Sequence, residues 1–373
     1  MTSVAFLVDQ LSARTPGGIG TYTRELLLAL TRADPSLRIA AFRSKGPDLP
    51  AWEFDAPEPV ELPWAIRRSY PLWALTGRPS LPERLQVCDL LHSPLPAAVP
   101  PAGLGQRLVV TVHDAAFLVR PDLFPRQWAL LYRAAFRRAA RHADAILVPS
   151  EHTAADVARL GKVERHRIHV TPLAAATSAP AIDVERTLQR LRVPRPFVLS
   201  VGTLEPRKNL PLLVRTYRQL AVRGAPQALV LAGGVGWRSG ELLRETRAEA
   251  PGRVVLTGAM SGAELDALYR TTDAFVYPSL YEGFGLPVLE AMSRGAPSIV
   301  SNAASLPEVA GDAAVLFDPR SQRDLLEAME RVLGDTDLAA RLRASGQIRA
   351  ATFTWHRTAR LTLEAYRSVV DDT

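Results

Sequence analysis

Short apolar runs recur along this chain and alternate with segments of helical periodicity, which is typical of parallel sheets covered by helices. The runs form two series. The first series comprises residues 4–8, 38–42, 87–91, 108–112, 145–148 and 168–170. The second comprises residues 197–201, 228–231, 254–256, 274–277, 298–300 and 314–317. The pattern predicts an α/β protein with two doubly wound, Rossmann-like lobes that face a central cleft.

The segment between the two series is rich in proline and alanine. We read residues 1–175 as an N-terminal lobe, 176–194 as a linker and 195–352 as a C-terminal lobe. Residues 353–373 hold a last helix, expected over about 355–370. The 373 residues, 47% of them hydrophobic, are enough for two such domains and their cores.

Charge and cysteine content exclude several classes of protein. The net charge is +7, and such a surplus can attract nucleic acid, anionic lipid or phosphorylated substrates. No basic block or basic-aromatic RNA motif is present, so no nucleic-acid partner is expected. Cys88 is the single cysteine and suits a reducing compartment. Neither a signal-peptide pattern nor a membrane-spanning apolar run occurs, so the sequence predicts a cytoplasmic protein.

Two glutamates flank a Gly-Phe-Gly turn in the second series. Glu282 is expected in a strand-to-helix loop, and Glu290 in the first turn of the helix that Pro287 begins. Both carboxylates, and the free N–H groups of the helix start, are then expected at the carboxyl end of the sheet, where ligands of open α/β sheets bind. The alternative is a pair of solvent-facing glutamates that gain ~0.3–1 kcal/mol from the helix dipole.

Two cations precede another helix. Arg207 and Lys208 are expected on an exposed loop, and Asn209 is expected to cap the helix that follows. Cations beside free N–H groups make an anion site, in which arginine offers two donors and lysine a mobile charge. The alternative is a basic loop with no ligand.

The first lobe carries weaker candidates. Gly17 and Gly18 follow the first strand and precede a helix, and glycines there allow close backbone approach. They depart from the full dinucleotide-binding fingerprint, which argues against NAD. His113 and Asp114 follow another strand. The alternatives are a structural histidine and an aspartate that caps the turn.

Residues 277–290 resemble the E-x7-E signature of the retaining glycosyltransferases of family four, which have the GT-B fold. The resemblance covers both lobes. It implies that Glu282 contacts the sugar of a sugar nucleotide and that Glu290 contacts the ribose hydroxyls. It also implies that sugar hydroxyls and phosphate oxygens are held by the amides of Gly283, Phe284, Gly285 and Leu286.

Residues 202–209 resemble the family's Gly-x5-Lys-Asn loop. The resemblance implies that Arg207 and Lys208 hold the donor diphosphate, with Gly202 and Thr203 in the same loop. It also places Gly17 and Gly18 beside the donor phosphate and the acceptor. By the same resemblance His113 lies near the donor sugar, as a hydrogen-bonding group rather than a compulsory base. The last helix commonly crosses back to the first lobe in this family.

The resemblance predicts a retaining hexosyltransferase that uses a nucleoside diphosphate sugar. The acceptor is expected to be a hydroxyl of a glycan, a lipid-linked glycan or a small molecule, in polysaccharide or glycoconjugate synthesis. The motif variants are most similar to the mannosyl- and rhamnosyltransferase branch, which favours GDP-mannose. No Asp-x-Asp follows a strand, so we expect the cations, and no metal or cofactor, to stabilise the leaving diphosphate. The alternatives are another sugar-nucleotide enzyme, such as an epimerase or phosphorylase, and a catalytically silent carbohydrate-binding protein.

Two basic-aromatic segments of the first lobe are candidates for contact with an anionic membrane, at its cytoplasmic face. The alternative is a solvated helix face and a packed loop. One segment contains Arg126, Trp128, Leu131, Tyr132, Arg133, Phe136, Arg137, Arg138 and Arg141. The other contains Trp64, Arg67, Arg68 and Trp73.

Overall fold

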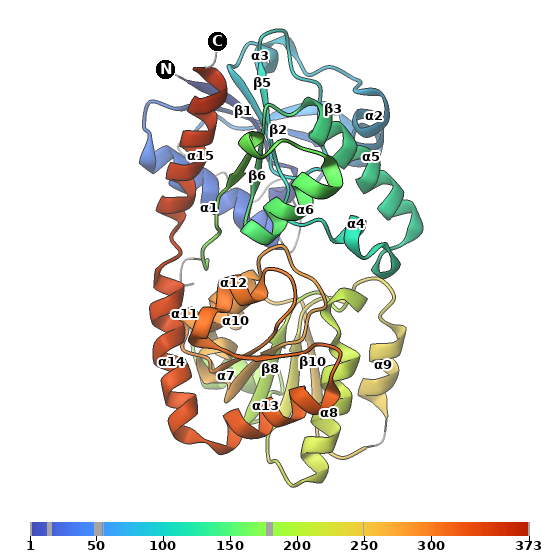
Figure 1. The fold of residues 1–373 in the computed structure, drawn as a ribbon, viewed down its shortest axis with the longest axis vertical. Coiled ribbons are helices and arrows are strands. Elements are labelled where there is room, and N and C mark those ends of the chain that lie inside the picture. The colour runs from blue at the N-terminus through green and yellow to red at the C-terminus, as the bar shows by residue number, and fades with distance from the viewer. Residues whose placement is uncertain are drawn as a thin grey trace. The chain divides into compact units, whose positions relative to one another are not determined.

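The computed structural model describes residues 2–12, 17–47, 54, 56–176, 182–248 and 250–371. The chain forms two compact units, of which the first comprises Met1–Leu173 and Thr354–Thr373, and the second Ala174–Phe353. Each unit is built on one sheet whose described strand pairs are parallel, with helices around it (Figure 1). The α/β class with two doubly wound lobes is therefore confirmed.

The sheet of the first unit has the strand order β3-β2-β1-β4-β5-β6-β7. The strands are β1 (Ser3–Leu7), β2 (Arg38–Lys45), β3 (Val60–Ala65), β4 (Leu90–Ser93), β5 (Arg107–Thr111), β6 (Ala145–Val148) and β7 (Ile168–Val170). The helices are α1 (Gly18–Ala33), α2 (Ile66–Thr76), α3 (Glu83–Gln86), α4 (Ala116–Val119), α5 (Arg126–His142), α6 (Glu151–Gly161) and α15 (Trp355–Val370). The order reverses between β1 and β4, which is where ligands bind in sheets of this kind.

The C-terminal helix packs on the first unit. α15 lies along α1 and reaches strands β5, β6 and β7 (Figure 1). Its fully buried Tyr366 and Ala359 face this contact. α2 and α5 pack on each other in the same unit.

The sheet of the second unit has the order β10-β9-β8-β11-β12-β13. The strands are β8 (Phe197–Val201), β9 (Ala228–Ala232), β10 (Val254–Gly258), β11 (Ala274–Tyr277), β12 (Ser298–Ser301) and β13 (Val315–Phe317). The helices are α7 (Val184–Arg190), α8 (Leu210–Val222), α9 (Gly240–Arg247), α10 (Gly262–Thr271), α11 (Leu286–Ser293), α12 (Leu306–Ala310), α13 (Gln322–Gly334) and α14 (Thr336–Ala351). Here the order reverses between β8 and β11.

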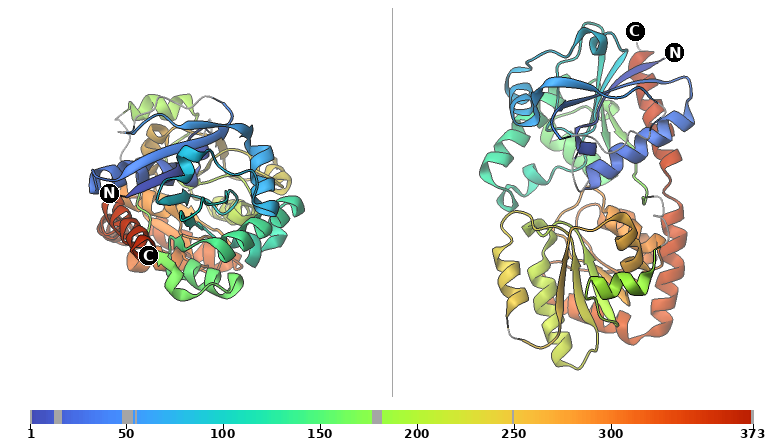
Figure 2. Two further views of the ribbon diagram at one scale, coloured as in Figure 1. Left: turned by 90° about the horizontal axis from the view of Figure 1, so that it is seen from above. Right: turned by 180° about the vertical axis from the view of Figure 1, so that it is seen from behind.

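One core of the second unit lies between the sheet and the helices α8 and α13. Leu213 and Tyr217 of α8 pack there with Leu325 and Met329 of α13, against β-strand residues such as Leu229. Further helices, among them α7 and α10, cover the other face (Figure 2). With helices on both faces, the ends of the strands and their loops are the parts of the sheet left to meet a ligand.

The sequence missed one strand and one helix. β3 was overlooked because Pro63 interrupts its apolar pattern, and proline is tolerated there since β3 lies at the edge of the sheet. The predicted linker contains helix α7, which Asp183 caps by accepting a hydrogen bond from the N–H of Arg186. Part of the linker, residues 177–181, lies outside the described residues. α15 has the bounds that its periodicity predicted.

Among the residues described, no helix is both long and apolar enough to cross a membrane.

Candidate active site

Two loops meet at the carboxyl end of the second unit's sheet. One follows β8 and the other follows β11, and these strands are neighbours at the point where the strand order reverses. The N–H of Leu280 donates to the carbonyl oxygen of Arg207 at 2.9 Å. Nη1 of Arg207 donates to the carbonyl oxygen of Tyr281 at 3.1 Å. The motifs that carry Arg207 and Glu282 are therefore one bonded structure.

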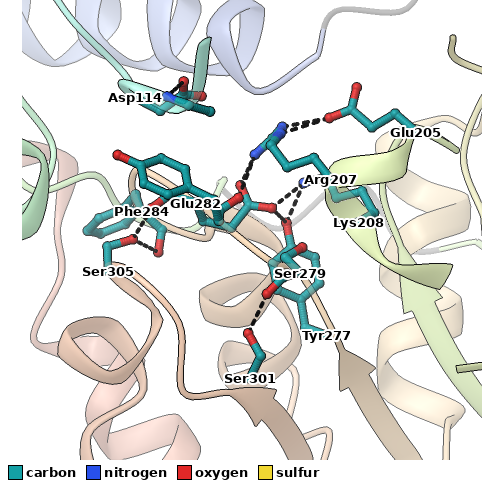
Figure 3. A network of polar contacts seen from close by, with 12 residues as sticks. Asp114, Glu205, Arg207, Lys208, Tyr277, Ser279, Glu282, Phe284, Ser301 and Ser305 are labelled. Carbon is teal, nitrogen blue, oxygen red and sulfur yellow. Dashed lines mark hydrogen bonds and ion pairs between the residues drawn. The ribbon is translucent and has the colours of Figure 1, made fainter. Parts of the chain in front are cut away.

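The carboxylate of Glu282 lies between the two cations (Figure 3). Its Oε2 is 2.6 Å from Nη1 of Arg207, and its Oε1 is 2.7 Å from Nζ of Lys208. The hydroxyl of Tyr277 donates to Oε1 at 3.1 Å and accepts from Lys208 at 2.7 Å. Every oxygen of this carboxylate thus has a charged partner.

Arg207 binds a second carboxylate, which the sequence did not single out. Its Nε and Nη2 both lie 2.9 Å from Oε1 of Glu205. The four charged side chains of this cluster are at most 14% exposed, and their formal charges sum to zero. The expectation that Arg207 and Lys208 lie on an exposed loop is wrong: they end a 3-10 turn, Pro206–Lys208, in which Lys208 is buried and Arg207 is partly buried.

The two carboxylates of the cluster differ in pKa because they differ in partners. Burial alone would raise the pKa of Glu282, but the charges of Arg207 and Lys208 outweigh it and lower the pKa to about 2. Burial raises the pKa of Glu205, and Arg207 offsets this only in part. Glu282 is therefore ionised throughout the physiological range, and Glu205 is the more readily protonated of the two.

Glu290 is held by a different partner. The sequence had placed Glu290 in the first turn of its helix. It is the fifth residue of α11 and therefore lies just past that turn. Its Oε2 accepts a hydrogen bond from the hydroxyl of Tyr269 on α10 at 3.1 Å. Burial raises the pKa of Glu290, against the hydrogen bond of Tyr269 and the charge of Arg294.

The turn between the glutamates is fixed by a serine from a neighbouring loop. Oγ of Ser305 lies 2.9 Å from the carbonyl oxygen of Glu282 and 3.1 Å from that of Phe284. Gly285 has φ 109°, and a Cβ there would lie 2.6 Å from Cδ2 of Leu306. The position therefore requires glycine, and the helix start at Leu286 depends on it.

A glycine-rich loop after β9 also lies at the carboxyl end of the second unit's sheet. A Cβ on Gly233 would lie 2.0 Å from the carbonyl oxygen of Gly202, so the two backbones touch. The N–H of Leu204 donates to the carbonyl oxygen of Gly234 at 2.9 Å. The sequence signal was available, since Gly233-Gly234-Val235-Gly236 directly follows a predicted strand.

Asn209 does not cap helix α8 as the sequence predicted. It adopts the left-handed conformation, with φ 54°. Its Nδ2 donates to the carbonyl oxygen of Pro319 at 2.8 Å instead. By contrast, Ser150 does cap its helix, α6, because its side chain accepts a hydrogen bond from the N–H of Thr153.

The first unit places its candidates at the start of α1 and after the end of β5. Gly17 is the N-cap of α1 and Gly18 its first residue. Nε2 of His113 donates to the carbonyl oxygen of Pro94 at 2.8 Å, which leaves Nδ1 as the acceptor of a neutral ring. Burial lowers the pKa of His113 to about 4, so the ring is neutral at pH 7. Asp114 accepts from the N–H of Ala116 and thus caps its own turn.

The part of the chain that the structure describes contains no group of three or more histidine, cysteine, aspartate or glutamate residues placed to hold a metal ion.

Residues 16–178 match the family model for glycosyltransferase family 4, and residues 183–349 match the model for glycosyl transferases group 1. The O-antigen chain mannosyltransferase B of Escherichia coli is 32% identical over 269 residues, which cover 70% of each protein. The chain belongs to the family-four glycosyltransferases. The predicted family is thereby confirmed, and the similarity to a mannosyltransferase agrees with the predicted branch.

Solved structures show the same fold. Sucrose-phosphate synthase from Thermosynechococcus elongatus superposes with a TM-score of 0.74 at 21% identity, over 100% of both chains. The Anabaena protein HepE, solved with UDP-glucose, superposes with a TM-score of 0.70 at 19% identity, over 98% of this chain and 100% of its own. This glycosyltransferase therefore has the GT-B fold.

Removing the central carboxylate should destabilise the second unit. Glu282→Gln leaves Arg207 and Lys208 buried without it, which typically costs about 3 kcal/mol or more. Glu290→Gln, which disturbs one hydrogen bond with Tyr269, should cost about 1 kcal/mol. Chemical denaturation of both variants at neutral pH checks the order, and equal losses would contradict the assigned geometry.

The low pKa of Glu282 also predicts how the stability lost in Glu282→Gln depends on pH. The folded-state pKa of Glu282, about 2, lies below its ordinary value of 4.5, so its stabilisation is present above pH 4.5 and is lost as the pH falls toward 2. The stability difference between the wild type and Glu282→Gln should therefore narrow across that window. A difference that stays constant down to pH 2.5 would contradict the prediction.

Proposed function

We propose that this glycosyltransferase moves a mannosyl unit from GDP-mannose to a hydroxyl acceptor, with retention of anomeric configuration and without a metal ion. The observation that carries the proposal is the pair of cations, Arg207 and Lys208, held by Glu282 at the carboxyl end of β8 and β11. The similarity to an O-antigen mannosyltransferase favours mannose as the sugar. Synthesis of a polysaccharide or another glycoconjugate is the proposed setting.

Arg207 and Lys208 are proposed to bind the donor diphosphate. The leaving diphosphate gains negative charge as the bond to the sugar breaks, and cations already in place stabilise that charge. The incoming diphosphate competes with the carboxylate of Glu282 for the same cations. A displaced Glu282 can then accept hydrogen bonds from the donor sugar.

The group transfer itself needs no strong protein base in this proposal. The bond between the anomeric carbon and the diphosphate oxygen breaks, and the acceptor oxygen bonds to that carbon on the same face. The acceptor proton passes to the departing phosphate oxygen. Neutral His113 is proposed to accept a hydrogen bond from a sugar or acceptor hydroxyl through Nδ1.

Backbone groups and Glu290 are proposed to hold the rest of the donor. Glu290 takes the ribose hydroxyls, and the backbone of the turn that leads into α11 is proposed to meet sugar and phosphate oxygens. The proposed donor-binding residues of the second unit, beside Glu290, are Gly202, Thr203, Gly283, Phe284, Gly285 and Leu286. Gly17 and Gly18 of the first unit are proposed to lie beside the phosphate and the acceptor.

A panel of sugar nucleotides tests this function. Purified protein is incubated with GDP-mannose, UDP-glucose and other donors, with and without EDTA, and release of free nucleoside diphosphate is measured. We expect the fastest release from GDP-mannose, unchanged by EDTA. Faster release from another donor would overturn the sugar assignment, and loss of activity with EDTA would overturn metal independence. No release from any donor, with or without a panel of acceptors, would indicate a silent binding protein.

The two glutamates should divide binding from catalysis. Glu282→Gln removes the carboxylate that competes for Arg207 and Lys208, so GDP should bind at least as tightly while kcat falls. Glu290→Gln should weaken GDP binding by about tenfold or more, because a charged hydrogen bond contributes ~1.5–3 kcal/mol and 1.4 kcal/mol is about tenfold. Calorimetric titration measures the GDP affinity of both variants.

Tyr269→Phe is the matched control for the second variant. It removes the hydroxyl that holds Glu290 but keeps the carboxylate, so GDP affinity should fall less than in Glu290→Gln. Weaker GDP binding in Glu282→Gln than in Glu290→Gln would reverse the assigned roles.

The proposal includes peripheral contact of the first unit with an anionic membrane at its cytoplasmic face. α2 and α5 pack on each other, and neither contains an acidic residue. Between them they carry the arginines Arg67, Arg68, Arg126, Arg133, Arg137, Arg138 and Arg141. Large apolar side chains are exposed on the same helices: Ile66, Leu72, Leu75, Trp128 and Leu130. Trp73 and Phe136, which the sequence had grouped with these residues, are buried in the core.

Vesicle flotation tests the membrane contact. The protein should float with vesicles that contain phosphatidylglycerol and not with pure phosphatidylcholine, since each arginine near an anionic surface contributes about 1 kcal/mol. Leu75→Ser with Leu130→Ser should reduce binding, whereas Val222→Ser, an equally exposed apolar site in the second unit, should not. Equal flotation of both variants would exclude α2 and α5 as the contact.

A further inference from the structure

A chain of buried hydrogen bonds links the elements α15, β4, β5 and α1 of the first unit. His92 on β4 is fully buried and uses both ring nitrogens. Nδ1 lies 2.5 Å from the hydroxyl of Tyr366 on α15, and Nε2 lies 2.8 Å from Oγ1 of Thr111 on β5. Oγ1 of Thr111 lies 2.9 Å from the hydroxyl of Tyr22 on α1. Four elements far apart in sequence thus meet in one polar chain.

Tyr22, at one end of this chain of hydrogen bonds, contacts His113. The ring of Tyr22 packs edge to face against the imidazole of His113, with centroids 4.6 Å apart and planes at 81°. The hydrogen bond from His113 goes to the carbonyl oxygen of Pro94, two residues after His92. The His113 ring is therefore constrained from two sides, by Tyr22 of α1 and by Pro94 directly after β4.

The polar composition of this chain has a physical consequence. Apolar residues of similar shape could fill the same space without loss of stability, because a buried hydrogen bond adds little over apolar packing. A fully paired buried network instead rigidifies its surroundings and favours one arrangement. Burial and the neighbouring His113 lower the pKa of His92 to about 3, so its ring is neutral and can satisfy both contacts.

We propose that His92 and Thr111 are positioning residues for sugar transfer: they hold Tyr22, whose ring fixes the imidazole of His113, and they tie that position to the C-terminal helix through Tyr366. Thr111 is the central link, since its one hydroxyl contacts both His92 and Tyr22. The inference rests on the proposed role of His113 in transfer.

A pair of substitutions at Thr111 tests the inference. Thr111→Val keeps the shape but removes the hydroxyl, and Thr111→Ser restores it. Thr362→Val is the matched control, because it removes a fully buried hydroxyl of α15 whose partner among the described residues is the carbonyl oxygen of Thr358, within the same helix. The full chain, labelled with nitrogen-15 histidine, is compared by NMR for the ring-nitrogen signals of His113, and by kcat and GDP affinity.

We expect Thr111→Val to shift the His113 ring signals and to lower kcat about tenfold or more, as misplaced catalytic groups do. GDP affinity should stay within about twofold, because Thr111 shares no partner with the proposed nucleotide-binding residues of the second unit. Thr111→Ser should recover both properties, and Thr362→Val should change neither. Tyr366→Phe removes one end of the chain and should give a smaller change in the same direction.

Two results would overturn the positioning role. One is that the ring-nitrogen signals of His113 in Thr111→Val and in Tyr366→Phe are the same as those in Thr362→Val. The other is an equal loss of kcat in Thr362→Val and Thr111→Val. Absence of transfer by the wild type would overturn the proposed function instead, while the NMR comparison still decides whether the chain positions His113.

Discussion

The ion pairs of one carboxylate, Glu282, organise the candidate donor site. Two cations and a tyrosine hydroxyl surround it, and its backbone is tied to Ser305. Because the cluster is buried, each charge depends on its partners, and loss of the Glu282 carboxylate would leave two buried cations, Arg207 and Lys208, with one carboxylate, Glu205. The loops after β8 and β11 are therefore held in place by the same groups that are proposed to meet the diphosphate. The charges balance before any ligand arrives.

The parallel sheet explains why these groups meet. Carboxyl ends of neighbouring parallel strands lie at one edge, so loops that are 75 residues apart in sequence can share an ion pair. Backbone contacts refine the arrangement, above all where Gly233 touches Gly202. Glu290 lies in α11, past its first turn, and is supported by Tyr269 from the preceding helix, α10. The two glutamates of one motif thus have separate environments, which is the physical basis for assigning them separate roles.

The candidate residue of the first unit is supported by neutral hydrogen bonds, whereas those of the second unit are held by ion pairs. His92, Thr111 and Tyr22 form a buried neutral chain that ends on the ring of His113. α15 contributes Tyr366 to this chain, so the last helix of the protein is part of the core of the first unit. A neutral network keeps its geometry across the physiological pH range, whereas the charged cluster of the second unit contains carboxylates that become protonated in acid.

The sequence by itself determined the fold class, the strand series, the bounds of α15 and the family, because periodicity and motif spacing are local properties. Glu282, Arg207 and Lys208 were identified in this way. Only the tertiary structure decided that they bind one another, that Glu205 and Tyr277 complete their shell, and that Asn209 is not a helix cap. Pairing, burial and pKa depend on which strands become neighbours, and a linear pattern does not contain those distances.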